Sequence, residues 1–278
     1  MSLSHFLVAK FHQQECLGGE VCLEKQIMIG VREMIKHNPA LALSLAALSL
    51  GARSLALASL TLPLNAQIAF AAQAGANRSE PFVDVATVVP GLIVEIRYAG
   101  SHNFVGRPID GYQAPHCLLT PPAATALAEV AHDVASRGLV IKVFDCYRPA
   151  RAVANFVRWA HDLSDQKEKA EFYPNVDKRA LFRSGYIATH SGHSRGSTAD
   201  LTLARADGRE LDMGTPFDFF SPKSWTANPT ISAEQHANRI LLAAAMRRHG
   251  FRGYDKEWWH FTLRNEPFPD TYFDFPVR

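Results

Sequence analysis

The fold is decided by residues 191–200, which run Ser191-Gly192-His193-Ser194-Arg195-Gly196-Ser197-Thr198-Ala199-Asp200. From Thr198 onward polar and apolar residues alternate, and this period of two predicts a strand over residues 198–203. Gly196 allows the chain before that strand to fold back on itself. We therefore expect a rigid strand to present Asp200, and a turn to bring His193 beside it.

A second stretch, Glu257-Trp258-Trp259-His260, adds another imidazole and another carboxylate. The sequence then offers three candidate metal ligands, His193, Asp200 and His260, and one additional carboxylate, Glu257. That set is typical of a catalytic zinc site with an open position for water and a base beside it. A regular strand would place Glu257 on the face opposite His260, so it needs a bend or the mouth of the strand to reach the same metal.

Each of these features also has an ordinary explanation. A lone histidine beside a glycine-rich turn is usually a surface or satisfied histidine, and paired tryptophans usually pack in a core. The joint occurrence of the two motifs favours the metal site. His190 is a rival ligand, but it falls outside the pattern and ranks below His193.

Arg148 and Asp218 are two further candidate site residues. Residues 139–144 are apolar apart from Lys142 and predict a buried strand, which runs directly into Asp145 and Arg148. The guanidinium of Arg148 suits a carboxylate or a developing oxyanion, and a salt bridge with Asp145 explains it equally well. Asp218 lies among phenylalanines, where a buried carboxylate needs a cation, either a substrate ammonium or a lysine or arginine elsewhere.

From about Pro90 to its end, the chain resembles the D-alanyl-D-alanine dipeptidases, a family of zinc peptidases. The resemblance rests on the two stretches above and on five more: Glu95-Ile96-Arg97-Tyr98-Ala99, Asn103-Phe104-x-Gly106, Asp145-Cys146-Tyr147-Arg148-Pro149, Ala170-Glu171-Phe172-Tyr173-Pro174 and Met213-Gly214-Thr215-Pro216-Phe217-Asp218-Phe219.

This resemblance implies a role for each candidate residue. One zinc ion would be held by His193, Asp200 and His260, and Glu257 would be the general base. Arg148 would stabilise the transition state, while Ser191 and Asp218 would help to hold the dipeptide. For Asn103, Phe104 and Tyr112 we prefer loop packing to substrate contact.

Five further segments carry the signals of regular structure, two of them strands and three of them helices. Val94, Ile96 and Tyr98 alternate with charged residues and predict a strand, and Phe251 to Leu263 forms another strand region. The first expected helix has Thr120 as its N-cap and Gly138 as its C′ residue. The second is indicated by apolar residues at 153, 156, 157 and 160. The third begins with a Ser232-x-x-Gln235 capping box, which precedes a core stripe of Ala237, Ile240, Leu241 and Ala244.

These elements interleave without a regular βαβ repeat. That order favours an α+β domain with a central, mainly antiparallel sheet, helices packed on it and the zinc site at the sheet. The resemblance implies the same architecture, the DD-peptidase/hedgehog-like type.

Residues 1–74 differ from the rest of the chain. From Pro39 to Ala74 the sequence is mostly Ala, Leu and Ser, after Arg32 and Lys36, and small residues fit a cleavage site at its end. We expect a secretory leader over 1–74 and a zinc dipeptidase domain over 75–278, exported or periplasmic, or cytoplasmic if the leader is not used. A membrane anchor or an ordinary helix is the alternative, although Arg53 and Pro63 argue against a full span.

Composition and cysteines limit the function further. The chain has 278 residues, 20% of them charged, with a net charge of +2, which gives no signature of nucleic-acid binding or disorder. The cysteines lack zinc-site spacing, so nitrogen and oxygen would bind the metal. Cys117 and Cys146 could pair in an oxidising compartment, although two buried thiols are slightly favoured.

Three other functions stay open at this point. They are a related DD-carboxypeptidase or other short-peptide zinc peptidase, a non-catalytic zinc-bearing binding module, and a metal-free peptide-binding protein. The presence of both Glu257 and Arg148 argues against the binding module, because a structural zinc site needs neither. A metal-free binder would leave the ligand motifs unexplained.

Overall fold

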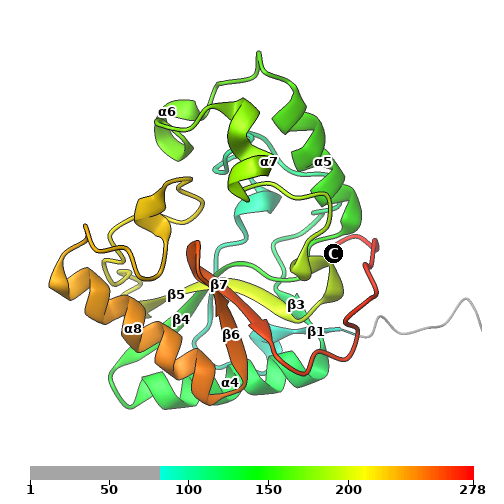
Figure 1. The fold of residues 1–278 in the computed structure, drawn as a ribbon. Helices are drawn as coiled ribbons and strands as arrows, with labels where there is room; N and C mark the ends of the chain where they lie inside the picture. Colours follow the sequence, from blue (N-terminus) through cyan, green and yellow to red (C-terminus); the bar gives the residue numbers. More distant parts are fainter. Residues whose placement is uncertain (1–81) are drawn as a thin grey trace, which may run out of the picture. The chain divides into compact units, whose positions relative to one another are not determined.

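The computed structural model describes residues 82–278 (Figure 1). The leader expected over residues 1–74 and the expected start of the mature chain near Gly75 lie outside this range. Within residues 82–278, no helix combines the length and the apolar character that a membrane crossing requires.

A five-stranded sheet in the order β2-β4-β5-β7-β6 forms the centre of the described region. Its strands are β2 (Ile93–Val94), β4 (Leu139–Asp145), β5 (Thr198–Arg205), β6 (Phe251–Tyr254) and β7 (Glu257–Leu263). β2 pairs with β4 in parallel and the other pairings are antiparallel. The predicted central sheet is therefore confirmed, as a mixed sheet with one parallel edge. A separate two-stranded sheet joins β1 (Val83–Asp84) to β3 (Leu118–Leu119).

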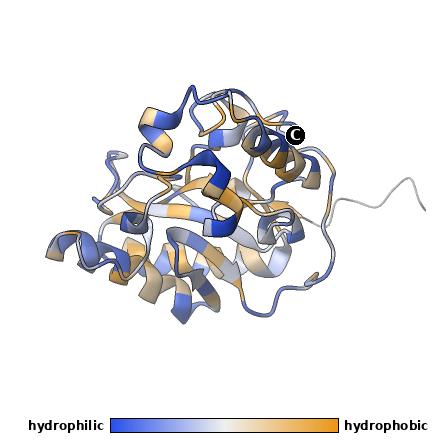
Figure 2. Ribbon diagram, turned by 45° about the horizontal axis from the view of Figure 1, so that its top comes forward, coloured by the Kyte–Doolittle hydropathy of each residue, from blue (hydrophilic) through white to orange (hydrophobic). Residues whose placement is uncertain are grey.

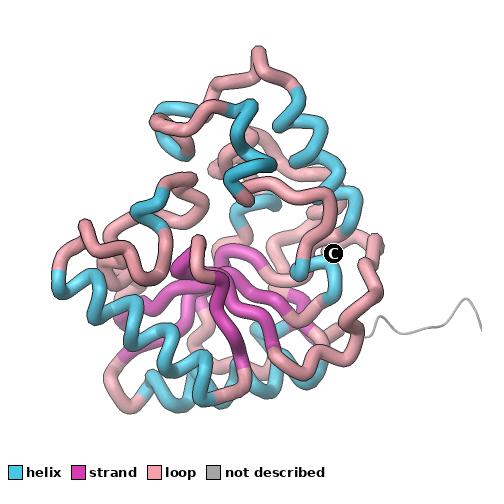
Figure 3. The backbone as a smooth tube through the Cα atoms, in the orientation of Figure 1, coloured by secondary structure: helices cyan, strands magenta, loops and turns pink. Residues whose placement is uncertain are grey.

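Helices lie on both sides of the central sheet (Figures 1 and 3). α4 (Pro121–Ala135) and α8 (Ala233–Arg248) contact each other and cover one face of the sheet. α5 (Ala150–His161), α6 (Lys169–Phe172) and α7 (Leu181–Ser184) stand over the other face with long loops. In Figure 2 hydrophobic residues gather along the central strands, and the helices show both colours, as expected for helices with one buried side.

β4 is largely buried, as the apolar run 139–144 predicted, and β5 is buried along nearly its whole length as well. The buried side of α4 includes Leu127, Val130 and Val134. Thr120 is the N-cap residue of α4, but its hydroxyl bonds the Ser197 hydroxyl at 2.7 Å and does not cap the helix. This bond ties the start of α4 to the chain just before β5.

One predicted helix end, in α4, and one predicted buried face, in α8, need correction. α4 ends at Ala135 with Ser136 as C-cap, so Gly138, at φ 70°, belongs to the following turn. The capping box of Ser232 and Gln235 is confirmed in α8, but the buried face differs from the predicted stripe. Ala237 and Ile240 are exposed, and the buried set is Arg239, Leu242, Ala245 and Met246.

The reason for the rotated face of α8 is a buried arginine. Arg239 donates to three backbone carbonyls, those of Met213 at 2.7 Å, Trp225 at 2.7 Å and Lys223 at 2.9 Å. These bonds hold both ends of the loop that carries Asp218. Hydrophobic periodicity could not predict this, because it counts a charged residue as solvent-facing.

The predicted strand over residues 94–98 is also wrong. β2 stops at Val94, and although the Glu95 amide still bonds the Val143 carbonyl at 2.9 Å, the chain turns into a 3₁₀ helix at Arg97–Ala99. Ile96 and Tyr98 are buried as the alternation suggested, but the turn, and not a strand, buries them.

Candidate active site

Three elements bring the predicted ligands together. Asp200 on β5 and His260 on β7 are direct partners across the antiparallel pair. His193 lies in the 3₁₀ turn Gly192–Arg195, which begins at Ser191 and ends at Gly196 with φ 79°. The ligand atoms of the three residues all lie within 4.8 Å of one another. The turn and strand predicted from residues 191–200 thus meet as expected.

The distances at this cluster suit a shared metal ion. His193 Nε2 lies 3.3 Å from Asp200 Oδ2 and 3.2 Å from His260 Nδ1, and His260 Nδ1 lies 3.1 Å from Asp200 Oδ1. His193 Nδ1 donates its proton to the Cys146 carbonyl at 2.7 Å, so the lone pair of Nε2 faces the cluster. Asp200 is buried and its Oδ1 accepts no hydrogen bond.

This donor set fits zinc. It offers two imidazole nitrogens and one carboxylate, which is the composition of many three-ligand catalytic zinc sites. The bond from His193 to a backbone carbonyl is the outer contact that fixes the tautomer of zinc-binding histidines. Burial opposes ionisation of Asp200, but the two neighbouring imidazoles hold its pKa well below the usual range, so the carboxylate is ready to bind a cation.

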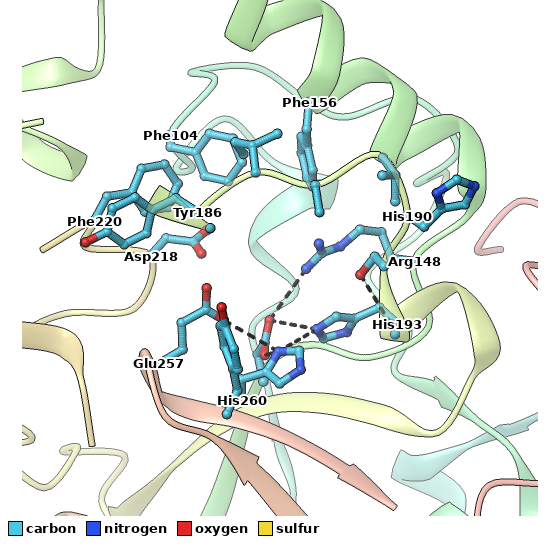
Figure 4. A pocket seen from close by; sticks show the side chains of 18 of the residues that line it. Phe104, Arg148, Phe156, Tyr186, His190, His193, Asp218, Phe220, Glu257 and His260 are labelled. Atoms are coloured by element: carbon cyan, nitrogen blue, oxygen red, sulfur yellow. Dashed lines mark hydrogen bonds and ion pairs between the residues drawn. The ribbon is translucent and has the colours of Figure 1, made fainter. Parts of the chain in front are cut away.

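Glu257 reaches the same side of the sheet as His260. It is the first residue of β7, opposite Tyr254, where the register between β6 and β7 shifts. Its Oε2 lies 3.6 Å from His260 Nδ1, and Figure 4 shows its carboxylate above the imidazole. Because Glu257 lies at the very start of the strand, it can reach the same side as His260, although a regular strand would place the two on opposite faces. Burial raises the pKa of Glu257 to about 7, although His260 opposes the shift.

Arg148 follows the end of β4 and is fixed from several sides. Its Nε and Nη2 donate to Asp145 Oδ2 at 2.9 and 2.7 Å, and Nη2 lies 3.6 Å from Asp200 Oδ2. The guanidinium also lies over the rings of Tyr98 and Phe156. The salt bridge with Asp145 is thus present, and Arg148 still lines the pocket.

Asp218 is a buried carboxylate that forms no ion pair within the described chain, although the charge of Arg148 acts on it. Its φ is 59°, in the left-handed region, and its Oδ2 accepts a hydrogen bond from Tyr98 at 2.9 Å. No lysine or arginine of residues 82–278 forms an ion pair with it, and burial, together with the charge of Asp200, raises its pKa well above the usual value. The alternative of a lysine or arginine partner thus has no ion pair to support it within residues 82–278, which leaves room for a cationic ligand.

A cavity of about 250 Å³ connects these groups (Figure 4). His193, Asp200, Glu257 and His260 lie on one side, and Arg148, Ser191 and Asp218 line it as well. Ser191 Oγ accepts a hydrogen bond from the His193 amide at 3.3 Å. His190 lines the pocket but is not part of the ligand cluster, and its ring lies 5.0 Å from that of Tyr272.

Sequence reasoning missed several aromatic residues of the wall. Tyr98, Tyr186 and Tyr254 line the cavity, and so does Phe104, for which packing alone was expected. Asn103 and Tyr112 do pack, the first bonding its own loop and the second donating to Asp145 Oδ1 at 2.5 Å. Tyr98 stands in one of the motif segments, which could have drawn attention to it.

Cys117 and Cys146 form a disulfide, so the slight preference for two buried thiols is corrected. The Tyr147 amide bonds the Leu118 carbonyl at 2.9 Å, and this brings the two cysteines to a Cα separation of 5.1 Å. The disulfide fixes Cys146, whose carbonyl orients His193.

Known proteins resemble this chain over most of its length. The family described as D-ala-D-ala dipeptidase matches residues 78–278. A D-alanyl-D-alanine dipeptidase of Enterococcus faecium is 41% identical over 69% of this chain and 95% of its own length. Those of Enterococcus faecalis and Streptomyces coelicolor are 40% and 41% identical, each over 70% of this chain and 98% of its own length.

Proposed function

This chain belongs to the D-ala-D-ala dipeptidase family, and on that premise we propose that it hydrolyses D-Ala-D-Ala to free D-alanine in a zinc-dependent reaction. The observation that carries the proposal is the meeting of three ligand atoms, a spare glutamate and an arginine in one cavity. A non-catalytic zinc module would need neither Glu257 nor Arg148.

Each residue has a role that follows from its surroundings. One zinc ion held by His193, Asp200 and His260 would acidify a bound water and polarise the scissile carbonyl. Glu257, with a pKa near neutrality, takes the proton of the attacking water and later gives it to the leaving amine. Arg148, held by Asp145, directs its remaining N–H groups at the developing oxyanion.

The substrate would be held by its two charged ends. Asp218 would receive the ammonium of the dipeptide, because a cation there would favour the ionised form of this buried carboxylate. Ser191 would help to hold the dipeptide from the opposite wall.

Metal analysis and a hydrolysis assay on the purified domain test this proposal. We expect one zinc per chain and release of D-alanine from D-Ala-D-Ala. Asp200→Ala should lose most of its zinc, because it removes one of three ligands. Full zinc content in that variant would refute the ligand assignment. Comparable rates on D-Ala-D-Ala and on longer peptides with the same ending would favour a DD-carboxypeptidase.

We also propose that residues 75–278 form the mature, exported enzyme, acting in cell-wall peptide metabolism or glycopeptide resistance. The family match beginning at residue 78 and the Ala/Leu/Ser-rich segment before it support this division. The disulfide supports an oxidising compartment such as the periplasm. N-terminal sequencing of the native protein should find a start near Gly75, and an intact leader on a cytosolic protein would refute export.

A further inference from the structure

The tip of the hairpin between β6 and β7 spans two other segments of the chain. Tyr254 pairs with Glu257, so Asp255 and Lys256 form the turn. The Asp255 carbonyl accepts a hydrogen bond from the Thr226 amide at 2.9 Å. On the other side, Lys256 Nζ donates to the carbonyl of Ser184, the last residue of α7, at 2.8 Å. The turn therefore links the loop after residue 225 to the end of α7.

This link runs along the rim of the cavity. The neighbours of its two ends, Gly185 and Tyr186 on one side and Tyr254 and Glu257 on the other, all line the cavity. A Cβ atom at Gly185 would lie 3.0 Å from Lys256 Nζ and 3.2 Å from Tyr254 Oη. Gly185 therefore lies close to the hairpin, with no room for a side chain between the two.

The closed rim lies on the Asp218 side of the site. In Figure 4 the Asp218 carboxylate is between Tyr186 and Glu257, and Tyr186 stacks on Phe220 with ring centroids 5.0 Å apart. If Asp218 receives the substrate ammonium, as proposed above, any residue attached to that nitrogen would have to leave the cavity here. The contact between Lys256 and Ser184 obstructs that exit.

We infer that Lys256, through its bond to the Ser184 carbonyl, is a specificity-determining residue that limits the substrate to a dipeptide. This inference rests on the proposed function and adds a steric limit to the charge requirement at Asp218. A peptide extended at its amino end must break the bond between Lys256 and Ser184 to bind, whereas D-Ala-D-Ala leaves it intact. The link thus acts against longer peptides without contacting the dipeptide.

The test compares kcat/KM for D-Ala-D-Ala and for a tripeptide with the same ending and a free amine. Lys256→Met keeps an unbranched side chain, one atom shorter, and removes the donor. We expect the ratio of tripeptide to dipeptide kcat/KM to rise on the order of tenfold or more, since a charged hydrogen bond no longer has to be broken. Lys256→Arg, which keeps a donor, should remain close to the wild type.

Lys169→Met is the matched control. Lys169 Nζ also donates to a backbone carbonyl, that of Val176 at 2.9 Å, but Lys169 does not line the cavity. Its removal should leave the ratio unchanged. Lys256 also lowers the pKa of Glu257, but an effect on proton transfer acts on both substrates alike and cancels in the ratio.

The outcomes separate this inference from the proposed function. A wild-type enzyme that prefers the dipeptide, with an equally selective Lys256→Met variant of full zinc content, would overturn the inference alone. No hydrolysis of D-Ala-D-Ala by the zinc-loaded wild type would overturn both. If Lys256→Met does not fold, Lys256→Ala removes the same hydrogen bond with a different side chain, and an unchanged ratio there would also refute the inference.

Discussion

Three carboxylates that line one cavity have their pKa values shifted differently because their neighbours differ. Asp200 lies between two imidazoles, which lower its pKa, whereas the pKa of Glu257 rises to about 7. Asp218 has only a tyrosine hydroxyl as hydrogen-bond partner among the described residues, and its pKa rises well above the usual value. These surroundings fit the proposed roles of Asp200 as a ligand, Glu257 as a proton carrier and Asp218 as a receptor for a cation.

Glu257→Gln tests the proton carrier. The amide keeps the size of the side chain but cannot take a proton, so we expect kcat to fall by about 10²–10⁴-fold. Zinc content should stay at the wild-type level, because Glu257 is outside the ligand cluster. Metal analysis and steady-state kinetics measure both quantities. A variant that loses its metal while keeping its rate per bound zinc would make Glu257 a ligand and not the base.

Asp218→Asn tests the receptor for the ammonium. The wild type should prefer D-Ala-D-Ala over its N-acetylated form by on the order of 10²–10³-fold in kcat/KM, because the acetyl group removes the cation that pairs with Asp218. In the variant this preference should shrink to a small factor. If the preference survives unchanged, another residue holds the amino group.

At the scale of elements, local patterns predicted single turns and strands, but they did not specify how distant segments pack against one another. The motif 191–200 predicted both the turn and the strand that present His193 and Asp200. The direct pairing of Asp200 with His260 depends on the register of β5 and β7, which no local pattern specifies. The same limit explains the missed face of α8, where Arg239 bonds a loop that begins 26 residues earlier.

Glu95 connects the short strand β2 to the sheet and gives stability a dependence on pH. It forms ion pairs with Arg97 and Lys142. Partial burial opposes its charge, but Lys142 and Arg97 outweigh burial and lower its pKa below 4.5. A lowered folded-state pKa means that the stabilisation is present above the unfolded-state pKa and is lost as the pH falls through the folded-state value.

Glu95→Gln should therefore be less stable than the wild type near neutral pH. Solvent screens this partly exposed group, so we expect a difference of ~0.5–1 kcal/mol in the free energy of unfolding. The difference should disappear at acidic pH below the folded-state pKa. Urea unfolding at both pH values measures it, and a difference that is constant with pH would show that charge is not its cause.

At the scale of the described region, the disulfide joins the stability of the fold to the geometry of the metal site. Cys117 and Cys146 are 29 residues apart, and closing a loop of that length stabilises a fold by about 3–4 kcal/mol. The Cys146 carbonyl also fixes the ring of His193. Loss of the disulfide should consequently lower the stability of the fold and leave the ring of His193 less firmly oriented.

The double variant Cys117→Ala/Cys146→Ala checks this expectation. Its metal-free form should unfold at lower urea concentration than the oxidised, metal-free wild type, by about 2–4 kcal/mol in free energy. Its zinc affinity should fall as well, because His193 is less firmly oriented. Dithiothreitol should change neither the urea unfolding nor the zinc affinity of the variant. Unchanged zinc affinity would mean that the turn alone orients His193.

The late position of β7 in the chain has a consequence for the time at which activity arises. β7 brings both His260 and Glu257, and it follows His193 and Asp200 by roughly sixty residues of intervening loops and α8. A nascent chain that has emerged only as far as α8 holds two of the three proposed ligands and lacks the proposed base. Pairing of β5 with β7 is a long-range step, and such steps form late in folding. An emerging polypeptide should therefore be unable to cleave any substrate until β7 has been synthesised and has docked beside β5.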